Sequence, residues 1–213
     1  MCTLSFPDTP CTVTFCFVHY ACDSHLLLAD LRPVCSGINM FTEKVCRHQL
    51  PYDVRACNGT LKIKLCYEYA VLFHHGIQRN ILRLAKTPNS FVVFGIGMHN
   101  KFNETLIIDS LLRPLVQTMR AERVTWPKII WAGVHKFGMV RTNKTTLGND
   151  RVREFNHNIE RFLARWGVPV FDTFNLTDKA MSFEGEHYGL GVNKMKVTIL
   201  LHYLQQLRSL GQW

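Results

Sequence analysis

The chain has 213 residues, of which 47% are hydrophobic and 19% charged, a balance that excludes a disordered protein and suffices for one folded domain, residues 1–213. Its net charge of +9 comes from Lys and Arg residues scattered without a basic helix or a recognisable nucleic-acid-binding motif, so we expect no nucleic-acid partner. No stretch approaches the roughly 18 apolar residues of a membrane span.

Short apolar segments, typical of buried strands, alternate along the chain with amphipathic segments, typical of helices. The expected strands are 13–20, 61–72, 91–97, 128–134 and 168–174, and the expected helices are 24–32, 77–86, 104–122, 150–167 and 190–210. Pro114 should disturb the third helix, and Gly167 should end the fourth. This alternation predicts an α/β protein, a three-layer α/β/α sandwich with a mainly parallel central sheet.

In such a sheet the ligand site lies beyond the carboxyl ends of the strands. The polar residues expected there are Cys22-Asp23-Ser24, Gly97-Met98-His99-Asn100, Gly133-Val134-His135 and Asp172. The strand ends are therefore where we look for chemistry.

Ser24 opens an expected helix after the first strand, where its hydroxyl would be exposed beside backbone N–H groups that can bind an oxyanion. A helix N-cap serine occupies the same position, so either interpretation is open for this residue alone. The glycine-rich segment Gly97–Asn100 lets the backbone approach a ligand, and Asn100 offers a side-chain N–H donor. A solvated turn with His99 and Asn100 in water is the alternative.

Near the end of the chain, SFEGEHYGLGVNKMK (182–196) combines carboxylates and a histidine with glycines just before the last helix. Glu184 precedes His187 by three residues, so a tight turn would set the carboxylate against one ring nitrogen and leave the other as a base. A solvated loop is the alternative. His135 ends the fourth strand and either contacts substrate or has a structural role.

The order Ser24, Asn100, His187, each at an expected strand end, resembles the SGNH, or GDSL-type, hydrolase superfamily, and within it the PC-esterase-like branch. The matching segments include FVVFGIGMHN, WAGVHKFG and SFEGEHYGLGVN, whereas residues 1–60, which are rich in cysteine, match poorly. The resemblance implies a flavodoxin-like sheet and a serine ester hydrolase or O-acyltransferase that acts on acyl, in particular acetyl, esters of glycans or similar substrates.

The resemblance also implies the roles of single residues. Ser24 would be the nucleophile, His187 the base and Glu184 the group that orients it. Asn100, Gly97 and the Ser24 backbone would form the oxyanion hole, and His99 and His135 would line the substrate site. This chemistry requires no metal ion and no other cofactor.

Three departures from the family pattern leave a second hypothesis open. Cys22 replaces a glycine before Asp23-Ser24, the third block has one residue more between its glycine and Asn100, and Glu184 replaces an aspartate. A longer side chain can misplace the histidine by about 1 Å, which can cost roughly a hundredfold in rate. The alternative is a catalytically inactive, secreted binding protein with the same fold.

Cysteines and sequons indicate the compartment. All eight cysteines lie within residues 2–66, without a CxxC pair, which favours disulfides over a zinc site; buried free thiols are the alternative. N-glycosylation sequons begin at Asn58, Asn103, Asn143 and Asn175. We therefore expect a glycoprotein of the secretory pathway, in the Golgi lumen or outside the cell. The stretch CTVTFCFVHYA lacks the flanks of a signal peptide, so a signal or anchor is expected only upstream of this chain.

Overall fold

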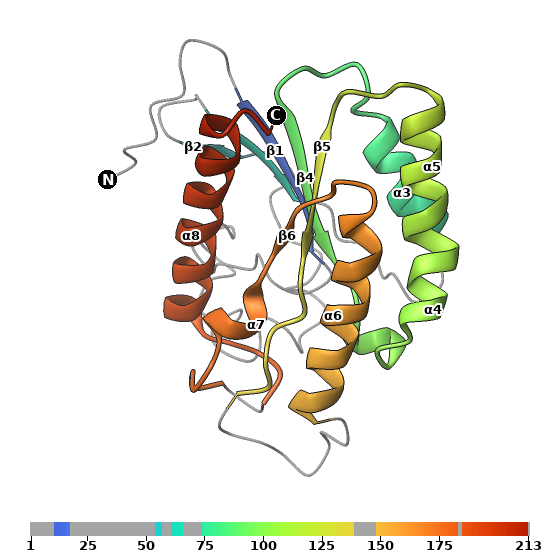
Figure 1. Cartoon of the computed structure of the whole chain (residues 1–213). Helices are drawn as coiled ribbons and strands as arrows, with labels where there is room; N and C mark the ends of the chain where they lie inside the picture. The colour runs from blue at the N-terminus through green and yellow to red at the C-terminus, as the bar shows by residue number, and fades with distance from the viewer. Residues whose placement is uncertain are drawn as a thin grey trace.

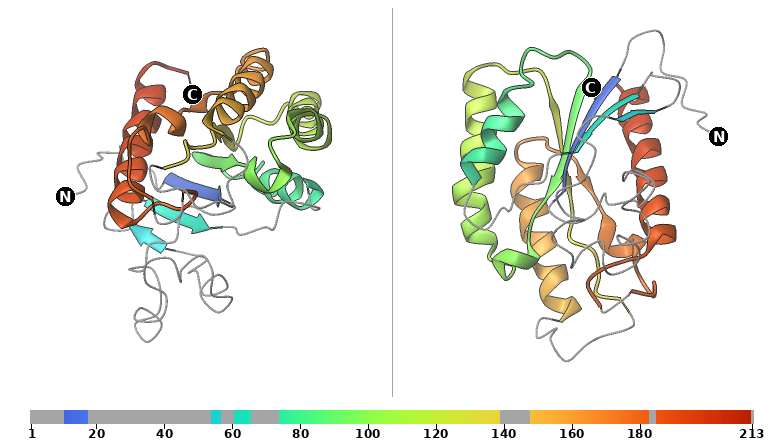
Figure 2. Two further views of the ribbon diagram at one scale, coloured as in Figure 1. Left: turned by 90° about the horizontal axis from the view of Figure 1, so that it is seen from below. Right: turned by 180° about the vertical axis from the view of Figure 1, so that it is seen from behind.

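A computed structural model describes residues 11–17, 54–56, 61–65, 74–138, 148–182 and 185–212, and it shows a twisted sheet between two layers of helices (Figures 1 and 2). The strands are β1 (Cys11–Phe17), β2 (Val54–Ala56), β3 (Leu61–Leu65), β4 (Ser90–Gly95), β5 (Lys128–Ala132) and β6 (Val170–Phe171). The helices are α3 (His74–Leu82), α4 (Glu104–Ile107), α5 (Arg113–Ala121), α6 (Asn149–Ala164), α7 (Thr173–Leu176) and α8 (Leu190–Ser209).

The sheet has the strand order β2-β3-β1-β4-β5-β6. All neighbouring pairs are parallel except β2 with β3, which is antiparallel. The chain steps from β1 outward to β3 and then returns past β1 to β4, so the direction of winding reverses between β1 and β4. That reversal is the topological switch point at which doubly wound sheets bind ligands.

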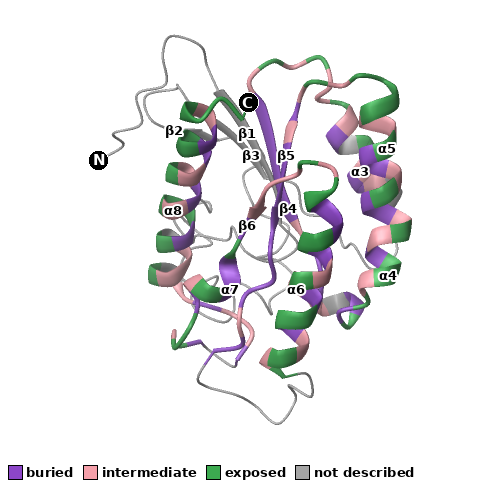
Figure 3. Ribbon diagram, in the orientation of Figure 1, coloured by how far each residue is buried: buried purple, intermediate pink, exposed green. Residues whose placement is uncertain are grey.

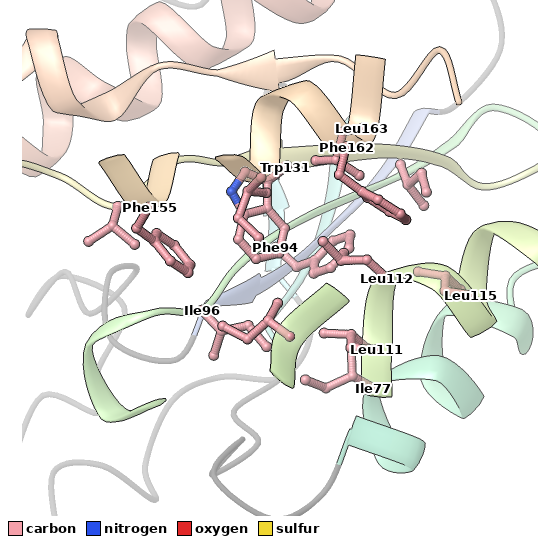
Figure 4. Packing of buried hydrophobic residues seen from close by; sticks show 14 of the residues in the cluster. Ile77, Phe94, Ile96, Leu111, Leu112, Leu115, Trp131, Phe155, Phe162 and Leu163 are labelled. Atoms are coloured by element: carbon pink, nitrogen blue, oxygen red, sulfur yellow. The ribbon is translucent and has the colours of Figure 1, made fainter. Parts of the chain in front are cut away.

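The two faces of the sheet are covered differently (Figure 2). Helices α3 to α6 cover one face, where Val92, Phe94 and Ile96 of the β4 segment pack with Trp131 and with residues of α5 and α6 (Figure 4). Successive side chains of a strand point to opposite faces, so Phe91 and Val93 point to the other face, which α8 covers. Leu200, Leu204 and Leu207 form the buried stripe of α8. β4 and β5 are thus mostly buried, with layers on both sides (Figure 3), as parallel strands usually are.

The helix expected at 104–122 is interrupted just before Pro114, as predicted. A π-helical turn, Ile108–Leu112, separates α4 from α5, which carries the proline in its first turn. Proline has no N–H to donate to the preceding turn. Gln78 of α3 compensates, because its Nε2 lies 3.3 Å from both the Ser110 and the Leu111 carbonyl oxygens.

The sequence-based prediction of an α/β/α sandwich with a mainly parallel sheet is confirmed. β4, β5 and β6 are shorter than expected. Gly167 follows α6 with a φ of 67°, in the left-handed region where glycine ends helices. The short strand β2 and the single-turn helix α7 were not predicted. The helix expected at 24–32 lies outside the described residues.

Candidate active site

The carboxyl ends of β4, β5 and β6 lie together, in the lower half of Figure 1. Two segments with polar residues occur there. The asparagine turn (residues 97–103) follows β4, and the histidine loop (residues 185–189) precedes α8. β1 also ends at this edge, at Phe17, which pairs with Gly95 at the end of β4.

The asparagine turn brings Asn100 into the interior. Asn100 is only 7% exposed, and its Oδ1 is buried without a hydrogen-bond partner. The Gly97 carbonyl accepts the N–H groups of both Asn100, at 3.1 Å, and Phe102, at 3.0 Å, which closes the turn. A buried amide oxygen without a hydrogen bond costs free energy of folding, and native structures keep few such atoms. Asn100 is therefore a candidate functional residue.

Gly97 is required by packing at this turn. A Cβ atom on Gly97 would lie 2.5 Å from Cγ2 of Val134 and 3.1 Å from the Phe155 ring. The glycine therefore lets the backbone after β4 pass close to the segment after β5. Packing between neighbouring segments thus requires a glycine here, and the approach to a ligand expected from the sequence stays a prediction.

The segment after β5, residues 133–138, is held by two asparagines of α6. The Val134 N–H donates to Asn156 Oδ1 at 2.8 Å, and Asn156 Nδ2 donates back to the Val134 carbonyl at 2.7 Å. Asn149, seven residues earlier on the same helix, accepts the Phe137 N–H at 2.7 Å. These side chains hold the segment in place much as a neighbouring strand would.

His135 joins this segment to the histidine loop. It is 1% exposed, and its Nε2 lies 2.7 Å from the Glu186 carbonyl oxygen. A carbonyl can only accept, so Nε2 carries the proton. The ring also packs edge-on against Tyr188, with centroids 5.1 Å apart. His135 therefore supports the loop that carries His187.

Three further hydrogen bonds fix the histidine loop. The Gly138 N–H donates to the Gly185 carbonyl at 2.8 Å, and the Gly185 N–H donates to Ser182 Oγ at 2.9 Å. The Tyr188 hydroxyl donates to the Lys136 carbonyl at 2.5 Å, and burial raises the pKa of this phenol, so it stays protonated. Gly185 has a φ of 105°, which residues with a side chain rarely adopt. The bend before His187 thus requires a glycine.

Comparison with solved structures identifies the fold. The native aryl esterase of M. smegmatis aligns with a TM-score of 0.53 at 10% identity, over 92% of this chain and 99% of that one. Est24, a carbohydrate acetylesterase from Sinorhizobium meliloti, aligns with a TM-score of 0.52 at 12% identity, over 92% and 99%. A member of the lipolytic protein G-D-S-L family from Veillonella parvula aligns at 0.48, with 15% identity, over 90% and 97%.

The chain has the SGNH-hydrolase fold. This confirms the resemblance drawn from the sequence at the level of fold. No protein-family model matches the chain, and no curated protein is significantly similar to it in sequence.

Within the SGNH fold, the structure describes some of the predicted site residues. Asn100, Gly97, His135 and the partly buried His187 all lie at the carboxyl edge of the sheet. Ser24 and Glu184 lie outside the described residues, as does the side chain of His99. Their roles stay predictions.

The described part of the SGNH fold shows neither a group of three potential metal ligands nor a helix long and apolar enough to cross a bilayer. Asn103 and Asn175, the two sequon asparagines that the structure describes, are both exposed. Asn58 and Asn143 lie outside the described residues, and so do the side chains of all eight cysteines, so their pairing stays a prediction.

Sequence reasoning missed the residues that support the site. Asn149 and Asn156 act through partners 12 and 22 residues away in the sequence, and nothing in their own neighbourhood marks them. α6 begins at Asn149, one residue before the helix expected at 150–167.

Proposed function

We propose that the chain is a serine ester hydrolase or O-acyltransferase of SGNH type that acts on acetyl or other acyl esters of glycans or similar substrates. The observation that carries this proposal is the anchoring of the histidine loop. His135 and Gly138, which follow β5, bind the Glu186 and Gly185 carbonyls and so hold the His187 backbone at the carboxyl edge where Asn100 also lies.

The fold supports the proposed place of the nucleophile. β1 ends at Phe17, beside the switch point between β1 and β4, and Ser24 comes seven residues later in the sequence. Among the structural neighbours are an aryl esterase and a carbohydrate acetylesterase, so the same architecture serves ester chemistry elsewhere. The acetylesterase is the neighbour that favours an acetylated glycan.

In the proposed reaction, Ser24 Oγ attacks the acyl carbonyl carbon while His187 accepts the hydroxyl proton. The carbonyl π bond opens to an oxyanion, which the Ser24 and Gly97 N–H groups and the Asn100 amide stabilise. Collapse expels the alcohol, which takes the proton from His187 and leaves an acyl-enzyme. Water then releases the acid in a hydrolase, whereas a sugar hydroxyl takes the acyl group in a transferase.

A fluorophosphonate probe tests the nucleophile. We expect covalent labelling that disappears in Ser24→Ala and His187→Ala and persists in Ser209→Ala, because Ser209 lies at the far end of α8. Acetate release from an aryl acetate and from an acetylated polysaccharide should follow the same pattern. A folded wild-type protein that is neither labelled nor active would overturn the proposal and favour the inactive binding protein.

The orienting role of Glu184 has its own test. If Glu184 orients His187, then Glu184→Asp should restore the family spacing and raise turnover, and Glu184→Ala should lower it. Equal turnover in both variants would show that Glu184 does not orient His187.

We also propose that the protein works in the secretory pathway, in the Golgi lumen or outside the cell. The cysteines and sequons support this location. Mass spectrometry of non-reduced peptides from protein secreted by cultured cells should find disulfides among residues 2–66. Free thiols throughout would contradict it.

A further inference from the structure

The asparagine turn contains two residues in an unfavourable backbone conformation. Lys101 and Phe102 follow Asn100 directly and have φ values of 50° and 53°. Neither is a glycine, so each costs roughly 1–2 kcal/mol relative to the ordinary helical conformation. Two successive strained residues persist only where the surrounding structure holds them.

Packing of the Phe102 side chain helps to stabilise the strained turn. It is 1% exposed, and its ring lies against Phe137, with centroids 6.4 Å apart, and against Phe155, at 5.6 Å. Packing fixes the ring, but the backbone carbonyl of Phe102 still needs a hydrogen-bond donor.

Arg151 of α6 supplies that contact. Its Nη2 donates to the Phe102 carbonyl at 2.6 Å and to Glu104 Oε2 at 2.6 Å. Glu104 is the first residue of α4, so one guanidinium binds the chain on both sides of Asn103. Asn158, two helical turns further along α6, donates to the other oxygen of Glu104 at 3.2 Å.

The Glu104 carboxylate remains charged in this arrangement. Partial desolvation would raise the pKa of Glu104, but hydrogen bonds from its own N–H, from Arg151 and from Asn158 hold it below its ordinary value. A planar guanidinium can serve a carbonyl and a carboxylate at once, which a lysine ammonium cannot do with the same geometry.

We propose that Arg151 is a positioning residue that holds the strained asparagine turn and thereby aims the Asn100 amide at the reacting acyl group. The inference rests on the proposed esterase function, since it assigns Asn100 to the oxyanion. No hydrogen bond holds Asn100 Oδ1, so the direction of this buried side chain depends on the backbone of the turn and on the packing around it. Arg151 contacts the turn and not the substrate.

The first test compares turnover. Arg151→Met should lower kcat tenfold to a hundredfold and leave KM nearly unchanged, because a displaced oxyanion donor weakens the transition state more than substrate binding. Arg153→Met, two residues away on the same helix, should keep wild-type kcat, because Arg153 pairs with the exposed Asp150. A rise in KM at constant kcat would instead place Arg151 in substrate binding and overturn the proposal.

A second substitution makes the test specific. Lys101 is exposed, and glycine adopts its φ without strain, so Lys101→Gly lowers the cost of the turn. In the Arg151→Met background, Lys101→Gly should recover most of the lost kcat. Failure to recover it in a protein of unchanged melting temperature would contradict a positioning role.

Amide hydrogen exchange gives a readout that needs no activity. The Asn100 and Phe102 N–H groups both donate to the Gly97 carbonyl and should exchange at least tenfold faster in Arg151→Met, with slow exchange restored by Lys101→Gly. If Arg151→Met fails to fold, Arg151→Lys should show the same changes, smaller in size. If the two N–H groups exchange at the wild-type rate in Arg151→Met, the positioning role is overturned. If only the proposed function is wrong, Ser24 is not labelled by the fluorophosphonate, but exchange in Arg151→Met is still faster.

Discussion

Lys196 is a charged residue on the inner side of α8. It is 7% exposed, and its Nζ lies 5.5 Å from the centre of the Tyr188 ring. Its neighbours in sequence, Met195 and Val197, are 38% and 37% exposed. The helix thus places a lysine inside and apolar residues outside at the end nearest the histidine loop.

Burial lowers the pKa of Lys196 from 10.5 to about 8. The unfolded chain therefore binds this proton more tightly, so the free energy of unfolding should rise as the pH increases from about 8 to 10.5. Lys196→Met should stabilise the protein at pH 7, by on the order of 1 to 3 kcal/mol, and the gain should shrink toward pH 10.

Denaturant unfolding at pH 7 and pH 10 checks this prediction. Lys86→Met is the matched control, because it removes an exposed lysine in place of a buried one. A gain in Lys196→Met that is equal at both pH values would show that Lys196 does not titrate in this window.

His135 allows a second test at the level of one residue. His135→Ala leaves the partly buried Glu186 carbonyl without its donor, which should cost about 1 kcal/mol of stability and lower kcat with it. His135→Gln keeps an N–H donor at a similar reach and should recover part of both. Thermal unfolding and ester hydrolysis measure the pair, and equal losses in the two variants would assign the effect to ring packing against Tyr188.

At the level of elements, β4 and β5 approach closely at their carboxyl ends. A Cβ on Gly95 would lie 2.2 Å from the Ala132 carbonyl oxygen, which belongs to the backbone and cannot move aside cheaply. Gly95→Ala should therefore destabilise the protein by about 3 kcal/mol. Gly191→Ala, where a Cβ meets nothing within 4 Å, should be neutral or stabilising.

Chemical denaturation of the two glycine variants separates the outcomes. Similar stability of both would mean that the strands can shift apart at this point. Activity should also fall in Gly95→Ala, since the asparagine turn begins two residues later.

Helices and strands of this chain were predictable because their apolar periodicity is strong. α8 and α6 follow the expected ranges closely, and the Pro114 break follows from the missing N–H of proline. The short strand β2 was not predictable, because a three-residue edge strand has too few positions to show alternation. Gln78 was equally hidden, since its task at the π-helical turn depends on a contact across 32 residues.

The candidate site was likewise predictable only in part from the sequence. The sequence shows Asn, His and Gly residues at the ends of the expected strands. Because parallel strands end at the same edge of a sheet, these residues could be predicted to lie near one another. The loop that carries His187 is held by the bond between His135 and the Glu186 carbonyl, a contact across 51 residues that only the folded chain reveals. Local patterns thus indicate which chemistry is present, and long-range contacts decide how it is held.

At the level of the whole molecule, two described sequons differ in how accessible their amide is. Asn103 caps α4 with its Oδ1, which accepts the Leu106 N–H, so the cap does not use Nδ2, the atom to which a glycan is attached. Asn175 instead donates its Nδ2 to Asp172 at 2.5 Å. We expect protein secreted from cultured cells to carry a glycan at Asn103 and less, or none, at Asn175.

Glycopeptide mass spectrometry tests this prediction. Thr105→Ala removes the sequon and should abolish the Asn103 glycan while the cap, worth about 1 kcal/mol, is retained. Asn103→Ala should lose both. Full occupancy at Asn175 with an empty Asn103 would contradict the argument from Nδ2.

The outermost strands of the sheet affect how readily the folded protein aggregates at high concentration. β2 has three residues and runs antiparallel, and β6 has two, preceded by Pro169 and ended by Asp172, which caps α7. Long open strands recruit further chains into intermolecular sheets, and very short ones offer a poor template. Crowding should therefore not convert the folded form into fibrils through these edges, and aggregation should begin only after the sheet itself has opened.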